Sequence, residues 1–176
     1  MTKILIVVDM QNDFVTGSLG SEQAKSIVPN VQKKIEMYRM RGDKVIFTRD
    51  THFDDYLETQ EGRNLPVVHC IKNTTGHEIV PELDTKNDEI YDKVSFGSTD
   101  IAKQLAAKGE FEEIELCGLC SDICVVSNAL ILKAQFPETK VTVDALCCAG
   151  VTEESHKAAL LTMKMCQVNV INQRDE

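Results

Sequence analysis

Short apolar runs recur along this chain and alternate with segments of helical periodicity, and this alternation limits the fold more than any other feature. The first run, residues 4–8, holds only Ile, Leu and Val, which is typical of a parallel strand buried on both faces. Strands that alternate with helices predict right-handed crossovers and a doubly wound sheet. We therefore expect a three-layer α/β/α fold with a six-stranded, mainly parallel Rossmann-like sheet, whose remaining strands lie near residues 44–48, 89–92, 113–117, 141–143 and 168–171.

Helical patterns fill most of the intervals between these strands. The first long helix is predicted with Pro29 near its start, where proline is tolerated, and Gly42 at its end. Its apolar stripe has three- and four-residue spacing and consists of Ile27, Val31, Ile35 and Tyr38. The segment 53–82 fits neither period and is long for a passive connection, which makes it a candidate functional segment. Further helices are expected over 98–109, from Ser121 or Asp122 to Gln135, and from Thr152 onward.

Length and charge exclude several classes of protein. With 176 residues, the chain is expected to form a single domain over 1–176. Its 28 acidic and 19 basic residues give a formal charge of −9, which disfavours nucleic-acid binding. The N-terminal apolar run of five residues is too short for a membrane span or a secretory signal. Seven cysteines without such a signal indicate free thiols in a reducing cytoplasm.

Reactive side chains follow several of the predicted strands. Ligands of doubly wound sheets bind outside the carboxyl ends of the strands. Asp9 follows the first strand, and Asp50 ends the second, with His52 just beyond it. Lys93 follows the third strand, and residues 118–124 follow the fourth. An acid, a metal-type pair, a cation and a thiol are therefore expected at one edge of the sheet.

Cys124 is the strongest candidate nucleophile. It lies about three residues into a predicted helix, where unpaired N–H groups and the helix dipole should lower the pKa of its thiol. The same N–H groups are able to hold an oxyanion. The competing interpretation is a packed core cysteine, and Cys120 offers a second thiol four residues earlier. Their C-x3-C spacing matches neither zinc nor redox signatures.

Asp9 and Lys93 are candidate partners of that thiol. Burial at the mouth of an apolar strand is expected to raise the pKa of Asp9 and suit it to proton transfer, although Asp also caps turns. Lysine is usually a surface charge, but Lys93 beside a thiol and a carboxylate would stabilise both anions. A cysteine flanked by a carboxylate and a cation is able to cleave amides.

A second cluster predicts a divalent metal site. Residues i and i+2 of an extended chain point to the same side, so Asp50 and His52 are able to share one cation. His69 is a third candidate ligand from the long segment, and Glu61 is a less certain fourth. Such ligands suit zinc, and manganese or iron less well, although D-x-H alone is a weak signal. The two remaining histidines, His77 and His156, are expected at the surface or as capping residues.

Taken together, these motifs resemble the isochorismatase-like cysteine hydrolases, and within that family the nicotinamidases. The resemblance covers nearly the whole chain in the family's order, which makes the combination far more specific than any one motif. It rests on Val8-Asp9-Met10-Gln11-Asn12-Asp13-Phe14 with Gly17-Ser18-Leu19, on Asp50-x-His52, on Leu65-Pro66-x-x-His69-Cys70, on Lys93 with Ser95-Phe96, and on Gly118-Leu119-x-x-Asp122-x-Cys124-Val125.

The resemblance implies a role for each matched residue. Asp9 becomes the proton shuttle, Lys93 its electrostatic partner and Cys124 the nucleophile. The backbone N–H groups of Cys120 and Cys124 become the oxyanion hole, after a non-proline cis peptide between Leu119 and Cys120. The implied metal ligands are Asp50, His52 and His69.

The implied substrate is a pyridine carboxamide. Phe14 matches the aromatic residue that packs on the nicotinamide ring, and a metal ion is able to bind the ring nitrogen. Many nicotinamidases have Trp inside the D-x-H motif, whereas this chain has Thr51 there and no Trp at all. Phe53 or Phe96 is expected to supply the missing wall of the ring pocket.

The resulting hypothesis is a cysteine-dependent amidohydrolase that converts nicotinamide to nicotinate and ammonia through a thioester. The alternatives are a relative that acts on another small amide, a carbamoyl compound or isochorismate, and a non-catalytic binding protein on the same fold. Nucleotide binding is disfavoured because the turn after the first strand lacks G-x-G-x-x-G. A homo-oligomer is expected by analogy with the family alone.

Overall fold

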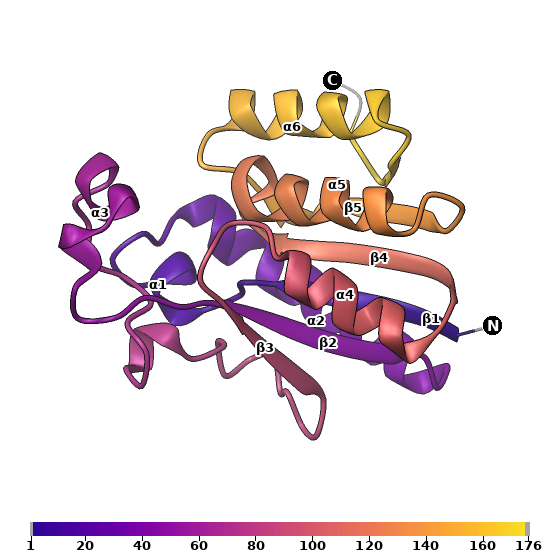
Figure 1. The fold of residues 1–176 in the computed structure, drawn as a ribbon, viewed down its shortest axis with the longest axis horizontal. Coiled ribbons are helices and arrows are strands. Elements are labelled where there is room, and N and C mark those ends of the chain that lie inside the picture. The colour runs from indigo at the N-terminus through magenta and orange to yellow at the C-terminus, as the bar shows by residue number, and fades with distance from the viewer. Residues whose placement is uncertain (1, 175–176) are drawn as a thin grey trace.

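The computed structural model describes residues 2–174. Its centre is a six-stranded sheet with the order β3-β2-β1-β4-β5-β6, in which every neighbouring pair is parallel (Figure 1). This confirms the predicted class. The strands are β1 (Thr2–Val8), β2 (Lys44–Asp50), β3 (Glu89–Lys93), β4 (Phe111–Leu119), β5 (Lys140–Ala149) and β6 (Asn169–Ile171).

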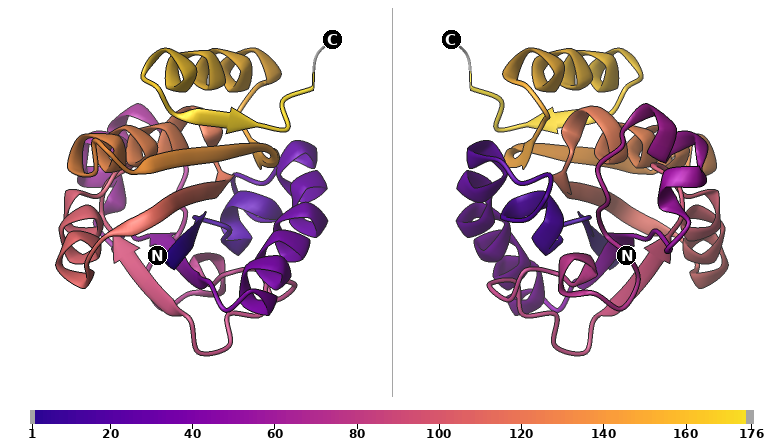
Figure 2. Two further views of the ribbon diagram at one scale, coloured as in Figure 1. Left: turned by 90° about the vertical axis from the view of Figure 1, so that its right-hand side faces the viewer. Right: turned by 90° about the vertical axis from the view of Figure 1, so that its left-hand side faces the viewer.

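Helices cover both faces of this sheet (Figure 2). Helix α2 packs on one face, mainly against β5, β2, β1 and β4, whereas α4 and α5 lie side by side on the other face. Helix α6 packs beside α5 near the β6 edge. The α-helices are α1 (Asn12–Val15), α2 (Glu22–Met40), α3 (Gln60–Asn64), α4 (Thr99–Lys108), α5 (Val126–Gln135) and α6 (Glu153–Met165), joined by short helical turns at Tyr56–Glu58, Thr75–His77 and Ser121–Val125.

The central strands have the burial that their apolar run predicts. Residues 4–8 of β1 are all buried, because β1 lies between β2 and β4 with helices on both faces. Gly118 near the end of β4 has a φ of +116°, and a Cβ at this position would lie 2.1 Å from the carbonyl oxygen of Val8. Only glycine therefore fits where β4 closes against β1 at the edge that carries the reactive residues.

Helix α2 differs from its predicted form at Pro29. The helix begins at Glu22, with Ser21 accepting a hydrogen bond from the Ala24 amide, so Pro29 lies in its interior and not near its start. The predicted stop is confirmed: Gly42 has a φ of +74°, its N–H donates to Arg39, and the next N–H, that of Asp43, donates to Tyr38. This is the Schellman pattern that a glycine after a helix favours.

The helix after β4 also differs from the prediction. Residues Ser121–Val125 form a π-helical turn, and the α-helix proper begins only at Val126. By contrast, α4 and α6 begin where expected, since Ser98 and Thr152 cap them with side-chain hydrogen bonds. Among residues 2–174, no helix combines the length and the apolar character that crossing a bilayer requires.

Candidate active site

The carboxyl ends of β1 to β4 meet at one edge of the sheet, where the long segment 53–82 folds over them (Figure 1). A cavity of about 530 Å³ opens there. Its lining combines reactive groups with apolar side chains and includes Phe14, Leu19, Asp50, Glu61, Leu65, His69, Phe96, Leu119, Cys120, Ile123, Cys124 and Val151.

Asp9 is held at the end of β1 in an unusual backbone conformation. Its φ is +48°, a value that non-glycine residues seldom adopt and that occurs at functional sites. The Thr48 side chain donates to Asp9 Oδ1 at 2.6 Å, and the Asp9 amide lies 3.2 Å from the Thr48 carbonyl oxygen. Burial raises the pKa of Asp9, against the opposing effect of Lys93. The carboxylate is therefore a stronger base than an exposed aspartate.

Lys93 joins the acid to the thiol. Its Nζ lies 2.7 Å from Asp9 Oδ2, 3.5 Å from Cys124 Sγ and 3.6 Å from Asp50 Oδ1. Burial opposes its charge, but Asp9, Cys124 and Asp50 together raise the pKa of Lys93. The lysine thus stays an ammonium ion inside the site. The structure thus brings together Asp9, Lys93 and Cys124, which the sequence places after three different strands.

Cys124 lies in the π-helical turn and is buried. The sequence predicted that the helix start would lower the pKa of its thiol, and that prediction is wrong. Burial, the charge of Asp9 and a hydrogen bond to Asp9 raise the pKa of Cys124 well above the ordinary value, although Lys93 acts in the opposite direction. The resting thiol is therefore protonated, and it needs a base to become a nucleophile.

The turn around this thiol has the backbone form that the resemblance implies. The peptide bond between Leu119 and Cys120 is cis. The amides of Ile123 and Val125 both donate to the Cys120 carbonyl oxygen and close the turn. Cys120 and Cys124 both line the cavity, and the use of their N–H groups as an oxyanion hole stays a prediction.

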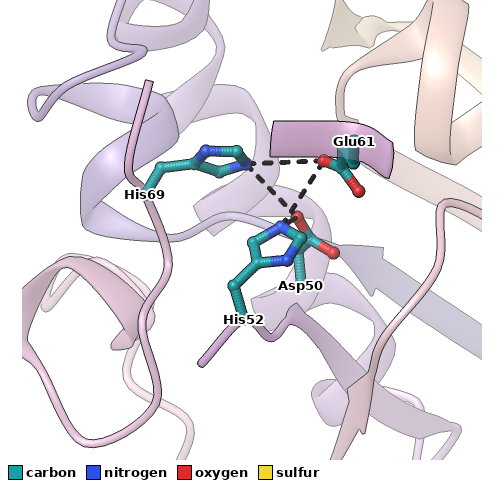
Figure 3. A group of neighbouring side chains, drawn as sticks. All are labelled: Asp50, His52, Glu61 and His69. Carbon is teal, nitrogen blue, oxygen red and sulfur yellow. Dashed lines mark hydrogen bonds and ion pairs between the residues drawn. The ribbon is translucent and has the colours of Figure 1, made fainter. Parts of the chain in front are cut away.

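Asp50, His52, Glu61 and His69 gather into a second group, called here the metal group (Figure 3). One ligand atom from each lies within 4.8 Å of all the others. His52 Nε2 is 3.0 Å from Asp50 Oδ2 and 3.5 Å from Glu61 Oε1, and His69 Nε2 is 3.7 and 3.8 Å from the same two oxygens.

This geometry fits a divalent ion. Ligand atoms on a tetrahedral zinc ion with bonds of about 2.1 Å lie about 3.4 Å apart, within the spread of the four distances. Hydrogen bonding to His52 and His69 and the charge of Lys93 lower the pKa of Asp50 although burial opposes this. His69 Nδ1 lies 2.7 Å from the Val67 carbonyl oxygen, which leaves its Nε2 for a metal.

Two residues that support the metal group were not foreseen. Tyr56 is buried with its ring 4.6 Å from that of His52 and 5.1 Å from that of His69, and its hydroxyl donates to the Leu65 carbonyl at 2.8 Å. Gln11 is buried and bonds both backbone groups of Asp50, accepting from its N–H at 2.7 Å and donating to its carbonyl at 2.8 Å. The sequence offered two signals for these residues: Tyr56 is an aromatic residue in the segment 53–82, and Gln11 is an amide two residues after Asp9.

The aromatic residues divide as follows. Phe14 and Phe96 line the cavity, whereas Phe53 is half exposed and not among the lining residues. Of the two walls expected in place of Trp, Phe96 is therefore the one at the cavity. Thr51 is buried, and its hydroxyl lies 2.9 Å from His77 Nε2.

The remaining histidines differ from expectation. His77 is buried, not at the surface, because its turn folds back on the strand end and the Gln11 side chain donates to its carbonyl at 2.9 Å. His156 is half-buried in α6, with Nδ1 2.7 Å from the Ser121 hydroxyl. Neither belongs to the metal group.

Comparison with known proteins gives consistent results. Residues 3–175 match the family described as the isochorismatase domain. A probable inactive nicotinamidase of Arabidopsis thaliana is 30% identical, covering 91% of this chain and 87% of its own, and the nicotinamidase of Schizosaccharomyces pombe is 27% identical, covering 97% and 93%. The crystal structure of the Pyrococcus horikoshii pyrazinamidase in complex with zinc superposes with a TM-score of 0.85 at 28% identity, covering 98% of this chain and 100% of its own.

Proposed function

The chain belongs to the isochorismatase family, and from that premise we propose that it is a cysteine-dependent amidohydrolase that converts nicotinamide to nicotinate and ammonia. The observation that carries this proposal is the cluster of Cys124, Lys93 and Asp9, with Lys93 Nζ 3.5 Å from the thiol and 2.7 Å from the carboxylate. Cys124 of this cluster lines the same cavity as Asp50, Glu61 and His69 of the metal group. The seven unpaired thiols favour a reducing cytoplasm as its setting.

The first step is attack on the carboxamide. Asp9 takes the proton of the Cys124 thiol, and the sulfur attacks the carboxamide carbon. Burial raises the pKa of the Cys124 thiol, which opposes this transfer, and it also raises the pKa of Asp9, which favours the transfer by making the carboxylate a stronger base. Lys93 stabilises the thiolate as its charge develops. The tetrahedral oxyanion is held by the backbone N–H groups of Cys120 and Cys124.

Collapse of the adduct completes the cycle. The carbon–nitrogen bond breaks, and the nitrogen takes the proton from Asp9 and leaves as ammonia, so a thioester remains on Cys124. Water then attacks the thioester carbon and gives a proton to Asp9. The carbon–sulfur bond breaks, and Asp9 returns the proton to the sulfur.

The metal group would hold an ion for the ring nitrogen, and the aromatic side chains of the cavity bind the ring itself. When bound, a zinc ion supplies a Lewis acid for the ring nitrogen of a pyridine amide. Asp50, His52, Glu61 and His69 would hold that ion, with manganese or iron as the alternatives. Phe14 and Phe96 contact the ring from the cavity wall, and they thereby orient the carboxamide toward Cys124.

Ammonia release tests the proposal. Purified protein loaded with zinc should release ammonia from nicotinamide, and Cys124→Ala should lower kcat by about 10³-fold or more. The control is Cys166→Ala, since Cys166 is exposed at the end of α6. A Cys124→Ala variant with the wild-type rate would remove the nucleophile from the proposal.

Two alternatives remain open to the same assay. The buried Thr51 at the D-x-H position leaves the ring wall to Phe96, which favours testing other amides beside nicotinamide. Ammonia release from pyrazinamide or a carbamoyl compound, but not from nicotinamide, would assign a different amide substrate to the same reaction. Hydrolysis of isochorismate would instead assign the protein to a different class of reaction. No activity on any of them would support a non-catalytic protein, as which the related Arabidopsis thaliana protein, a probable inactive nicotinamidase, is described.

A further inference from the structure

Asn128 is a buried amide in the first turn of α5, one turn after the nucleophile. Its Nδ2 donates to the carbonyl of Cys124 at 2.8 Å and to the carbonyl of Phe96 at 3.0 Å. Its Oδ1 accepts from the Ser98 amide at 3.0 Å. One side chain thus joins the turn that carries the thiol to the loop that carries an aromatic wall of the cavity.

The loop over residues 94–98 is held mainly by hydrogen bonds, since Lys93 Nζ also donates to the Ser95 carbonyl at 3.1 Å. It connects β3 to α4 without regular structure, and its large side chains, Val94 and Phe96, are 69% and 44% exposed. The backbone lies directly on α5, since a Cβ at Gly97 would lie 2.6 Å from Ile131 Cδ1 and 3.0 Å from Ser127 Cβ. Hydrogen bonds therefore fix this loop more than side-chain burial does.

We propose that Asn128 is a positioning residue that sets the place of Phe96 relative to Cys124, and that it thereby determines how well the site accepts a planar ring amide. This inference rests on the proposed function. Asn128 itself does not line the cavity, so it acts through Phe96 and not by contact with substrate.

Removal of the Asn128 side chain is expected to weaken ring binding because it breaks the hydrogen bonds that hold the loop. Without the Asn128 side chain, the Phe96 carbonyl, the Ser98 amide and the Cys124 carbonyl each lose this partner, and the loop is held less firmly against α5. Ring binding then loses a fixed aromatic surface, whereas Asp9, Lys93 and Cys124 keep their mutual contacts. KM for nicotinamide should rise about tenfold with kcat changed by less than about threefold. KM for a small aliphatic amide should not change.

The test is a double-mutant cycle on affinity, which needs no turnover. Nicotinate binding is measured by calorimetry on the zinc-loaded wild type, Asn128→Ala, Phe96→Ala and the double variant. Asn128→Ala should weaken binding about tenfold, and the double variant should bind no more weakly than Phe96→Ala alone. The matched control is Asn30→Ala in α2, which removes another amide that donates to a carbonyl, that of Leu146 at 3.0 Å.

Every result of these measurements either supports or contradicts the positioning role of Asn128. Additive losses in the cycle, unchanged affinity in Asn128→Ala, or no ring binding by the wild type would overturn it. Ring binding with a non-additive cycle but no ammonia release would uphold it while contradicting the proposed function. If Asn128→Ala does not fold, Asn128→Ser takes its place, and faster hydrogen exchange of the Ser98 amide, absent in Asn30→Ala, reports the released loop.

Discussion

The chemistry of single residues depends on how burial and charge act on the Asp9, Lys93 and Cys124 side chains. Burial makes Asp9 a stronger base and Cys124 a weaker acid, while Lys93 limits both effects from within 3.5 Å. A thiol that stays protonated until substrate arrives is also protected from oxidation, since the thiolate is the reactive form. The base and its buried position are thus as important to the proposed reaction as the sulfur.

Asp9 predicts the acidic side of the pH profile. The carboxylate accepts the thiol proton only when it is ionised, so activity should fall as the pH is lowered through the pKa of Asp9. Because burial raises this pKa, the fall should begin at a higher pH than it would for an exposed aspartate. With zinc in excess, kcat/KM against pH should show this limb. Asp9→Asn should lower kcat by about 10²- to 10⁴-fold, and an Asp9→Asn variant that keeps the rate would contradict the base assignment.

Gln11 predicts an effect on metal affinity. Its side chain bonds the N–H and the carbonyl of Asp50, so Gln11→Ala should free this ligand and weaken zinc binding about 10- to 100-fold. Competition with a chromophoric chelator measures this without turnover. Gln32→Ala, at an exposed position of α2, is the control. Unchanged affinity in Gln11→Ala would show that Asp50 is placed by its strand alone.

Single-residue roles were only partly predictable from the sequence. The residues at strand ends were found because parallel strands deliver their carboxyl ends to one edge. Gln11, Asn128 and Tyr56 were missed because a side chain that bonds a distant backbone group leaves no periodic signal. His77 was misplaced for the same reason, since its burial depends on a turn that folds back on another strand.

At the scale of elements, α2 carries more than the apolar stripe that predicted it. Lys34, between the stripe residues, is buried, and it pairs with Glu115 of β4 and with Asp144 of β5, the latter at 2.7 Å. Tyr38 donates to the same Glu115. The pattern of apolar residues predicted the buried face of the helix. It gave no indication that a lysine on this face would form ion pairs with carboxylates of two strands.

This buried ion cluster predicts a large change in stability. Lys34→Met leaves two buried carboxylates without their cation, which should lower the free energy of unfolding by about 3–5 kcal/mol. Urea unfolding measures the change. Lys33→Met, at the exposed neighbouring position, should change it by less than about 0.5 kcal/mol. Equal effects of the two substitutions would contradict the structural role given to Lys34.

At the scale of the whole molecule, the sheet order brings the site together. β1 lies between β2 and β4, so residues 9, 50, 93 and 119–124 meet at one edge although they are far apart in the chain. The class of fold was predictable from the alternation of strands and helices. The π-helical turn and the path of segment 53–82 were not, because both depend on tertiary contacts made at that edge.

Global stability should also depend on acid pH through Glu113 in β4. Hydrogen bonds from Thr142, Lys140 and Lys3 lower its pKa to about 2 although burial opposes this. Because the folded pKa lies below the unfolded one, the carboxylate stabilises the fold above about pH 4.5. That contribution is lost as pH falls toward 2. Since Lys3 and Lys140 are partly exposed, Glu113→Gln should cost only about 1–2 kcal/mol at pH 7.

Urea unfolding of the wild type and Glu113→Gln at pH 7 and pH 3 measures this contribution. The gap between the two proteins should narrow at the lower pH. A gap of the same size at both values would show that the glutamate contributes packing and not charge.

Whether Cys124 forms the thioester is decided by the mass of the protein during turnover. Acid quenching of the zinc-loaded enzyme with nicotinamide, followed by peptide mass analysis, should find a nicotinoyl group on Cys124 and on none of the other six cysteines. A reactive nicotinate ester, which acylates the enzyme without an amide, shows whether the quench traps an acyl-enzyme. Ammonia release with the acyl group on another cysteine would contradict the role of Cys124. Ammonia release with Cys124 unmodified, under a quench that traps the ester-derived acyl-enzyme, would contradict it as well.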